Sequence, residues 1–251
     1  MKIQVYQELD QLNAAAAELF ISTLQEKRDA VLGLATGGTP IEIYSKLREA
    51  HKRGEVSFEQ AMSFNLDEYV GLPDEHPESY RSYMNAHLFN HINLPADRAN
   101  IPNGNAADAE AECERYERAI AQAGQIDLQL LGLGHNGHIG FNEPAQELNS
   151  RTHVVTLKQE TREANARFFD SIDQVPKHAI TMGIGSIMKS RRILLVVKGA
   201  DKASIVKQAL EGPISTQCPA SLLQAHANLV VLLDTGAASQ LSQDVYTLGG
   251  E

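Results

Sequence analysis

Cysteine is scarce in this sequence. The 251 residues contain two, Cys113 and Cys218, which lie far apart and form no Cys-x-x-Cys pair. A disulfide framework is therefore excluded, and we expect a protein of the reducing cytoplasm.

Long apolar runs are also lacking. The longest, 193–197 and 229–233, are far too short to span a bilayer. Near the start of the chain, Glu8, Asp10 and Glu18 interrupt the stretch in which a signal peptide needs an unbroken apolar region. We therefore expect neither a membrane partner nor an export signal.

Positive charge is in deficit. The chain has 22 Lys and Arg against 32 Asp and Glu, which gives a formal net charge of −10. Such a surface repels nucleic acid and anionic membranes, so neither is an expected partner. An anionic small molecule would need local cations gathered around it.

Internal repeats and proline- or serine-rich linkers are lacking too, so we expect one domain over residues 1–251. Short apolar runs alternate with helical patterns, which predicts an α/β fold with a doubly wound, mostly parallel sheet and helices on both faces. Ligands bind such sheets at the carboxyl ends of strands. The predicted strands are IQVY, AVLGLA, AMSFNLD, IDLQLLGLG, THVVTL, RRILLVV and NLVVLLD, and the predicted helices lie near 8–28, 40–53, 78–91, 106–123 and 201–211.

Two adjacent glycines follow the second predicted strand, in the segment 36–40, TGGTP. Thr39 is a good N-cap, Pro40 suits the first helical position, and Glu42 would complete a capping box. The segment also suits an anion, because the glycines let backbone N–H groups approach a phosphate at the start of the helix. It is not a P-loop, since no Gly-Lys-Ser/Thr follows. A plain helix cap and a phosphate site both remain open.

Asp67 and Glu68 follow the third predicted strand. Adjacent residues of a strand point to opposite faces, so only one of the two carboxylates can face a shared pocket. The alternative is a pair of solvated loop residues.

The segment 132–144, GLGHNGHIGFNEP, follows IDLQLL. Its glycines match the dinucleotide pattern G-x-G-x-x-G, but that pattern requires a helix to open here, and Gly140 and Pro144 argue against one. His135 and His138 have an H-x-x-H spacing without a cysteine or a helical face to align them. We therefore expect neither a dinucleotide nor a metal.

An acid–base role remains for the same segment. Histidine titrates near neutrality, and His138 is placed to move protons. Glu143 could orient it, as a carboxylate does in a catalytic triad. The alternative is a structural histidine in an Asn-Gly turn.

Three basic residues in the second half of the chain are candidate ligands for an anion. Arg162 and Arg167 lie in TREANARFF, and Lys202 lies in GADKAS. A lysine at the start of a helix is poorly placed for the helix dipole, which suggests a role in binding. As isolated charges, all three could equally be solvated.

Six stretches, taken together and in order, resemble the glucosamine-6-phosphate deaminase family. They are LGLATGGTP, FNLDEYVGL, SYRSYM, GLGHNGHIGFNEP, TREANARFF and the lysine of GADKAS. The resemblance implies a doubly wound parallel sheet and the conversion of glucosamine 6-phosphate and water to fructose 6-phosphate and ammonia, without a cofactor. The partner would be a small-molecule sugar phosphate.

The resemblance also implies roles for single residues. Asp67 would be the base that moves the C2 proton toward C1, and His138 would be the acid–base group for ring opening, with Glu143 as its partner. Asn136 departs from many members, which have aspartate there; an amide can orient a neighbour but cannot carry charge. The phosphate would be held by Thr36, Gly37, Gly38, Thr39, Arg167 and Lys202.

Regulation is a further point of comparison. Some members are hexamers activated by N-acetylglucosamine 6-phosphate, whose phosphate is held by basic residues. The matching positions here carry His153 and Val155, although Arg151 and Thr156 lie nearby. Valine offers a phosphate nothing, so we expect no activation and a monomer, with a homo-oligomer as the alternative.

Two rival functions are weighed against this one. The first is a 6-phosphogluconolactonase-like hydrolase, which has a similar Gly-x-Gly…Gly-His loop but differs at the position of Glu143. The second is a non-catalytic sugar-phosphate sensor, which would need no Asp67 or His138 and would need an output domain.

Overall fold

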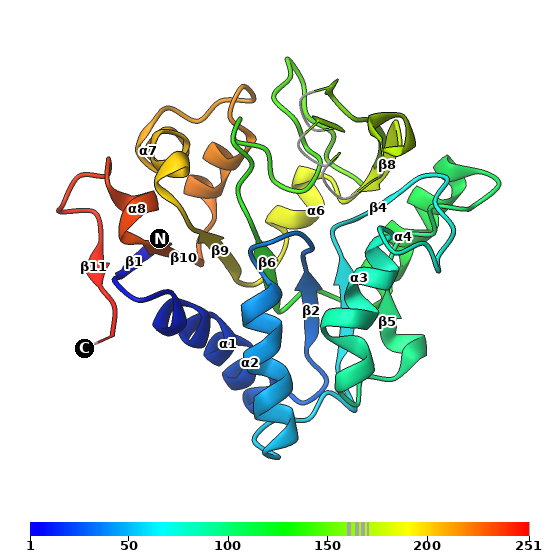
Figure 1. The fold of residues 1–251 in the computed structure, drawn as a ribbon, viewed down its shortest axis with the longest axis horizontal. Coiled ribbons are helices and arrows are strands. Elements are labelled where there is room, and N and C mark those ends of the chain that lie inside the picture. The colour runs from blue at the N-terminus through cyan, green and yellow to red at the C-terminus, as the bar shows by residue number, and fades with distance from the viewer. Residues whose placement is uncertain (160–161, 164–165, 167–168, 170, 251) are drawn as a thin grey trace.

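A parallel β-sheet forms the centre of the molecule (Figure 1). The computed structural model describes residues 1–159, 162–163, 166, 169 and 171–250. Within these ranges the main sheet has the strand order β11-β1-β10-β9-β6-β2-β3-β5, and its neighbouring strands are parallel. The predicted α/β class and parallel, doubly wound sheet are confirmed.

Helices alternate with these strands along the chain, and α1 and α2 lie side by side in front of the sheet in Figure 1. The strands of the main sheet are β1 (Lys2–Tyr6), β2 (Val31–Leu34), β3 (Met62–Asn65), β5 (Ala99–Asn100), β6 (Leu128–Leu131), β9 (Ile193–Val197), β10 (Leu229–Asp234) and β11 (Thr247–Leu248). The α-helices are α1 (Leu9–Glu26), α2 (Ile41–Lys52), α3 (Tyr80–His87), α4 (Ala109–Gln122), α6 (Ile184–Met188), α7 (Ala203–Glu211) and α8 (Thr235–Ala238). Short 3₁₀ helices are η1 (Phe89–His91), η2 (Ala96–Arg98), η4 (Ile172–Gln174), η5 (Ala200–Lys202) and η6 (Pro219–Ala225).

Both faces of the central strands are covered. Every residue of β2, β6 and β9 is buried, which is the pattern of parallel strands packed on two sides. At Gly33 in β2, an added Cβ would lie 2.1 Å from Oε1 of Gln129 in β6, so a larger residue there would require the Gln129 side chain to move. In the described part of the chain, no helix is long and apolar enough to cross a membrane.

A second, smaller sheet is antiparallel, with the order β4-β8-β7. Its strands are β4 (Asp67–Tyr69), β8 (His178–Thr181) and β7 (His153–Thr156). The segment THVVTL was expected in the parallel sheet, and that expectation is wrong, because as β7 it pairs with β8. The sequence did not predict β8 itself, whose four residues, HAIT, alternate too briefly to show a strand pattern.

The predicted strand AMSFNLD is divided at Leu66. The N–H of Leu66 donates to the carbonyl of Leu34 in the main sheet at 3.0 Å, and its carbonyl accepts from the N–H of Met182 at 2.7 Å. The chain therefore passes from the main sheet to the small one at this residue. Asp67, the first residue of β4, lies directly beyond the carboxyl end of β3.

The start of α2 differs from the predicted capping box. Pro40, with helical φ of −83° and ψ of −9°, is the N-cap, and no side chain forms a capping hydrogen bond. The carbonyl of Pro40 already accepts the first helical bond, from Tyr44 N–H at 2.8 Å. Thr39 lies one residue too early to cap the helix, so the segment before α2 is free for another role.

The topology reverses direction between β2 and β6. From β2 the chain continues to β3 and β5 on one side, and from β6 it continues to β9 and β10 on the other. In doubly wound sheets, ligands bind at the carboxyl ends of strands at such a switch point. The segments 36–40 and 132–144 follow these two strands.

Candidate active site

A pocket of about 400 Å³ lies at this switch point. Its walls come from the loops after β2 and β6, from the start of β4, and from α3 and η5. It is lined by Ala35, Thr36, Gly37, Gly38, Thr39, Leu66, Asp67, Tyr80, Gly132, Leu133, Gly134, His135, His138, Gly140, Phe141 and Lys202. Asn136 and Glu143 lie behind His138, whereas Arg167 lies outside the described residues.

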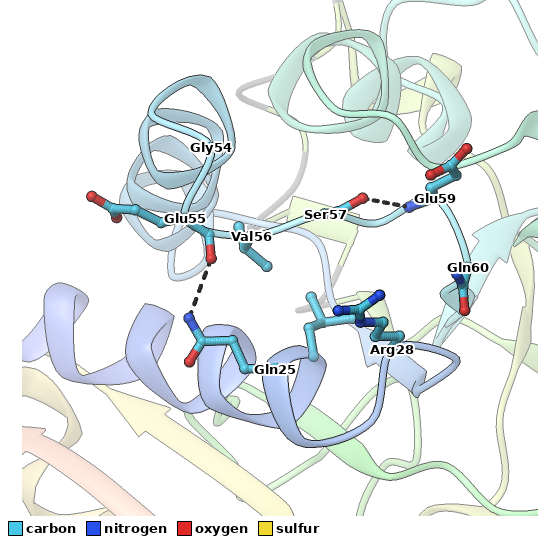
Figure 2. Close-up of a pocket in the computed structure, with 9 residues that line it drawn as sticks. Gln25, Arg28, Gly54, Glu55, Val56, Ser57, Glu59 and Gln60 are labelled. Carbon is cyan, nitrogen blue, oxygen red and sulfur yellow. Dashed lines mark hydrogen bonds between the residues drawn. The ribbon is translucent and has the colours of Figure 1, made fainter.

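A somewhat larger cavity, of about 450 Å³, lies between the end of α1 and the segment 54–60 (Figure 2). It is at the amino end of β3, away from the edge where ligands bind in sheets of this kind. Its nine described lining residues include no histidine or cysteine. We therefore place the chemistry in the smaller pocket.

The loop after β2 has the geometry of an anion site. Gly37 has a φ of +89°, which favours glycine, and nothing lies within 4 Å of a Cβ added at Gly37 or Gly38. Two carbonyls of the loop are bonded to protein: Gly37 accepts from the Tyr83 hydroxyl at 2.6 Å, and Thr39 accepts from Lys198 Nζ at 3.0 Å. Among the described residues, the N–H groups of 37–39 have no acceptor. These N–H groups are available to an anion.

Lys202 supplies a cation to the same pocket. Its Nζ donates to the carbonyl of Leu133 at 2.9 Å, which fixes the amine beside the loop after β6. Burial lowers the pKa of Lys202, which marks an amine partly removed from water. Arg162 has a different role from the one considered above, because its guanidinium donates to the carbonyls of Ile172 and Val175.

Asp67 is the carboxylate that lines the pocket, and the residue is 6% exposed. Burial and, to a smaller extent, the neighbouring charge of Glu68 raise the pKa of Asp67 to about 8. Gly140 lies close by, since a Cβ there would be 3.6 Å from Asp67 Oδ2. A carboxyl group with a pKa near neutrality is well matched to general-base catalysis.

Glu68 points away from the pocket, as strand alternation predicts. Its carboxylate accepts from the backbone N–H groups of Tyr69, Tyr80 and Arg81 at 2.8, 3.0 and 2.9 Å. Only Asp67 of the pair therefore lines the pocket.

His138 is oriented by a chain of hydrogen bonds through Asn136. His138 Nδ1 lies 2.7 Å from Asn136 Oδ1, and Asn136 Nδ2 donates to Glu143 Oε2 at 2.6 Å. The amide donates to the carboxylate, so its oxygen accepts and Nδ1 carries the proton. Nε2 of the neutral ring is then the nitrogen that can accept a proton. Glu143 Oε1 is 3.4 Å from Nδ1 and is buried, so it can hold the charge of an imidazolium.

Gly134 is needed for this placement of the ring. A Cβ at Gly134 would lie 2.3 Å from Nε2 of His138, so the imidazole packs directly on the glycine backbone. His135, three residues before His138, instead contacts Asp201 at 2.8 Å on the exposed rim. The two histidines therefore have different partners.

The comparisons with known proteins agree with this geometry. A family model described as glucosamine-6-phosphate isomerases/6-phosphogluconolactonase matches residues 7–232. The chain belongs to the glucosamine-6-phosphate isomerase/6-phosphogluconolactonase family. Within this family, the chain is 53% identical over 239 residues to glucosamine-6-phosphate deaminase 1 of Bacillus subtilis, covering 95% of this chain and 98% of that protein. It is 46% identical to the glucosamine-6-phosphate deaminase of Thermoanaerobacter pseudethanolicus, with 97% and 96% covered.

Solved structures of the family give the same result for the fold. A monomeric glucosamine-6-phosphate deaminase superposes with a TM-score of 0.93 at 52% identity, covering 96% of this chain and all of that one. The 6-phosphogluconolactonase of Trypanosoma brucei superposes with a TM-score of 0.77 at 21% identity, covering 96% and 98%. The second likeness shows the fold alone.

Sequence reasoning missed three residues of the site: Tyr80, Phe141 and Lys198. Tyr80 and Phe141 line the pocket with nearly parallel rings whose centroids are 6.2 Å apart. Both lie in the motifs SYRSYM and GFNEP that carried the resemblance, which was the available signal. Lys198 at the end of β9 had no such signal, because its contact with Thr39 joins residues far apart in the sequence.

Proposed function

We propose that this protein is a glucosamine-6-phosphate deaminase, which converts glucosamine 6-phosphate and water to fructose 6-phosphate and ammonia. The observation that carries the proposal is the pairing of Asp67 with the His138–Asn136–Glu143 chain across one pocket that ends in a phosphate-sized loop of free N–H groups. Relatives named for this activity cover nearly the whole chain at 46–53% identity.

The substrate's phosphate would bind the N–H groups of Gly37, Gly38 and Thr39, with Lys202 neutralising part of its charge. Thr36 belongs to the same loop and also lines the pocket. Arg167 is retained as a further ligand of the phosphate on the resemblance alone. Holding the phosphate end fixes the distances of the sugar's reacting carbons from Asp67 and His138.

Ring opening would use His138. Neutral Nε2 can take the proton of the C1 hydroxyl and return a proton to the ring oxygen, which breaks the bond between C1 and that oxygen. The imidazolium that forms in between is stabilised by Asn136 and by the carboxylate of Glu143.

Isomerisation would use Asp67. Its carboxylate removes the proton from C2 of the open-chain aldehyde and delivers it to C1, through an intermediate in which C1 and C2 share a double bond. In the same step O1 gains a proton and the amino group releases one, so that C1 becomes a CH2OH group and C2 an imine. Water then hydrolyses this imine to the ketone of fructose 6-phosphate and ammonia. The reaction is thus a deaminating isomerisation that consumes one water, and no step requires a metal or an organic cofactor.

The proposal extends to the organisation of the protein. Residues 1–251 form one catalytic domain, in which the pocket lies where the loops after β2 and β6 of the main sheet meet β4 of the small sheet. The enzyme acts as a monomer in the cytoplasm; the two cysteines, free and buried, suit a reducing setting.

Ammonia release separates this function from its rivals. Glucosamine 6-phosphate incubated with the enzyme should yield equal amounts of ammonia and ketose phosphate, and galactosamine 6-phosphate in a parallel reaction tests the choice of amino sugar. Hydrolysis of 6-phosphogluconolactone without ammonia release would favour the lactonase. Binding of both sugars without turnover would favour a sensor. The Asp67→Asn variant is the matched control for contaminating activity.

A further inference from the structure

Glu68 is a buried carboxylate that the reaction described above does not use. It is 3% exposed, and it accepts hydrogen bonds from three backbone N–H groups, those of Tyr69, Tyr80 and Arg81. Two of these belong to the first turn of α3, whose N–H groups lack partners within the helix. Glu68 therefore ties the start of α3 to β4.

The position of β4 in the small sheet makes this contact possible. β4 pairs with β8 along one edge only, and within the described residues its other edge pairs with no strand. Glu68 meets α3 on the face opposite to Asp67. The loop at Gly104 closes over it, since a Cβ at Gly104 would be 3.3 Å from Glu68 Cγ and 1.9 Å from the carbonyl oxygen of Tyr69.

The contact also places Tyr80, which is the first residue of α3. Its N–H donates to Glu68 and its ring lines the pocket. The ring packs with those of Phe141 and Tyr69, whose centroids are 6.2 and 4.8 Å away. The side chains of Tyr69 and Tyr80 are joined by a hydrogen bond. One carboxylate thus fixes the wall of the pocket beside Asp67.

The charge of Glu68 also contributes, after burial, to the raised pKa of Asp67. Burial raises the pKa of Glu68 as well, and its three backbone hydrogen bonds oppose that rise. The other titratable groups facing Asp67 are the hydroxyls of Tyr69, Tyr80 and Tyr116 and, across the pocket, His138 and Lys202. Burial raises the pKa of each of the three tyrosines, to about 12 for Tyr69, so they are neutral in the working range. The negative charge next to the base therefore comes from Glu68.

We propose that Glu68 is a positioning residue for the base, which holds Tyr80 and the start of α3 against β4 and keeps a second negative charge beside the Asp67 carboxylate. This role rests on the proposed function. It makes Asp67 a stronger base than an isolated carboxylate, because a like charge nearby disfavours its ionised form.

The Glu68→Gln variant tests the charge. The acidic limb of the kcat/KM profile reports ionisation of the base in the free enzyme. We expect this limb to move to lower pH by about 1 unit, the size of shift that a neighbouring charge produces, while inhibition by inorganic phosphate stays unchanged. The matched control is Glu117→Gln. Glu117 is a half-buried carboxylate that accepts hydrogen bonds from Thr152 and Ser186 away from the pocket. The acidic limb of the kcat/KM profile of Glu117→Gln should lie at the same pH as that of the wild type.

The Glu68→Asp variant tests whether the contact of Glu68 with the start of α3 positions the pocket wall. Aspartate keeps the charge but reaches less far toward α3, so the limb should stay near its wild-type pH while kcat falls about 10-fold or more through misplacement of the pocket wall. An acidic limb that is the same in Glu68→Gln, Glu117→Gln and wild type would overturn the proposal.

A measurement on the wild-type protein covers the case in which Glu68→Gln fails to fold. Carboxyl ¹³C NMR, with Asp67 assigned from Asp67→Asn, should show Glu68 ionising at lower pH than Asp67; the reverse order overturns the proposal. A wild-type enzyme that releases no ammonia would contradict the proposed function. If the wild-type enzyme is active and its acidic limb lies at the same pH as that of Glu68→Gln, only the proposed role of Glu68 is contradicted.

Discussion

The amide oxygen of Asn136 lies 2.7 Å from Nδ1 of His138. The nitrogen of the same amide donates to Glu143 at 2.6 Å, so a neutral side chain lies between the imidazole and the carboxylate. Asn136 fixes the tautomer of the ring, and the negative charge that faces it comes from Glu143, 3.4 Å away. This arrangement bears on the pH dependence of ring opening.

Asn136→Asp should change that pH dependence. The new carboxylate would accept from Nδ1 in place of the amide oxygen, and its charge favours the imidazolium. We expect the limb of the pH–rate profile that reports His138 to move to higher pH. The new charge also repels Glu143, so we expect a lower Tm. A profile that superposes on that of the wild type would contradict this account.

Asp67→Asn should remove the base. An amide cannot accept the C2 proton, and loss of a positioned general base costs about 10²–10⁴-fold in rate. Inorganic phosphate should still inhibit with its wild-type constant, because the loop at 36–40 is untouched. Turnover close to that of the wild type would remove Asp67 from the mechanism.

The same variant should be more stable than the wild type at high pH. The pKa of Asp67 is about 8 in the folded protein against an ordinary value of 3.8, so the folded state holds a proton that the unfolded chain releases. This contribution to the free energy of unfolding is fully present below about pH 4 and is lost as the pH rises through about 8. We expect Asp67→Asn to melt about 5 °C or more above the wild type at pH 9, and by a smaller margin at pH 5.5.

Calorimetry at the two pH values checks this prediction. Asp97→Asn is the control, because Asp97 is exposed on η2 and should melt with the wild type at both. Equal melting temperatures of Asp67→Asn and wild type at pH 9 would show that the buried charge of Asp67 does not destabilise the folded protein.

Lys202→Ala should weaken phosphate binding. A charge-assisted hydrogen bond contributes about 1.5–3 kcal/mol, so we expect the KM for glucosamine 6-phosphate and the inhibition constant of phosphate to rise by about 10–100-fold. Lys207→Ala is the matched control, since Lys207 on α7 pairs with Glu211. If the two variants bind phosphate equally well, Lys202 does not contact the anion.

The strand β7 bears on regulation. His153 contacts the carbonyl of Arg151 at 2.9 Å, and Val155 packs against the apolar cluster around Tyr69 and Phe141. A site that lacks two of the activator-binding cations has little difference in affinity between two states with which to shift their equilibrium, although Arg151 lies nearby. We expect hyperbolic kinetics that N-acetylglucosamine 6-phosphate leaves unchanged, and a monomer by light scattering. A sigmoidal rate curve made hyperbolic by that sugar would contradict this prediction.

The central strands and long helices could be predicted because their burial leaves a clear pattern. The unbroken apolar runs ILLVV of β9 and LVVLL of β10 are buried except at Val230, which is half-buried. The strand β8 has no such run, and the pairing of THVVTL with it depends on contacts between distant residues. The division of AMSFNLD at Leu66 was also hidden, since a passage between two sheets leaves no local signal.

The site could be predicted as far as its motifs reached. Asp67, His138 and the glycine loop each follow a strand, so the topology rule brings them together. The hydrogen-bonded chain from His138 through Asn136 to Glu143 could not be derived from the sequence. The same residues could equally form a direct ion pair between His138 and Glu143, with Asn136 to one side. Lys198, which bonds the carbonyl of Thr39, became visible only when the ends of β2 and β9 were placed in space.

The switch point between β2 and β6 divides the chemistry between two lengths of chain. The proposed phosphate loop and Asp67 precede the connection 123–127, whereas His138, Glu143 and Lys202 follow it. If the chain were cleaved there, neither fragment would possess both proton-transfer groups, and each would be inert alone. Activity would return only when the fragments reassociate, with β2 against β6, β1 between β10 and β11, and β4 against β8. Fragment complementation would therefore report directly on the pairing of these strands.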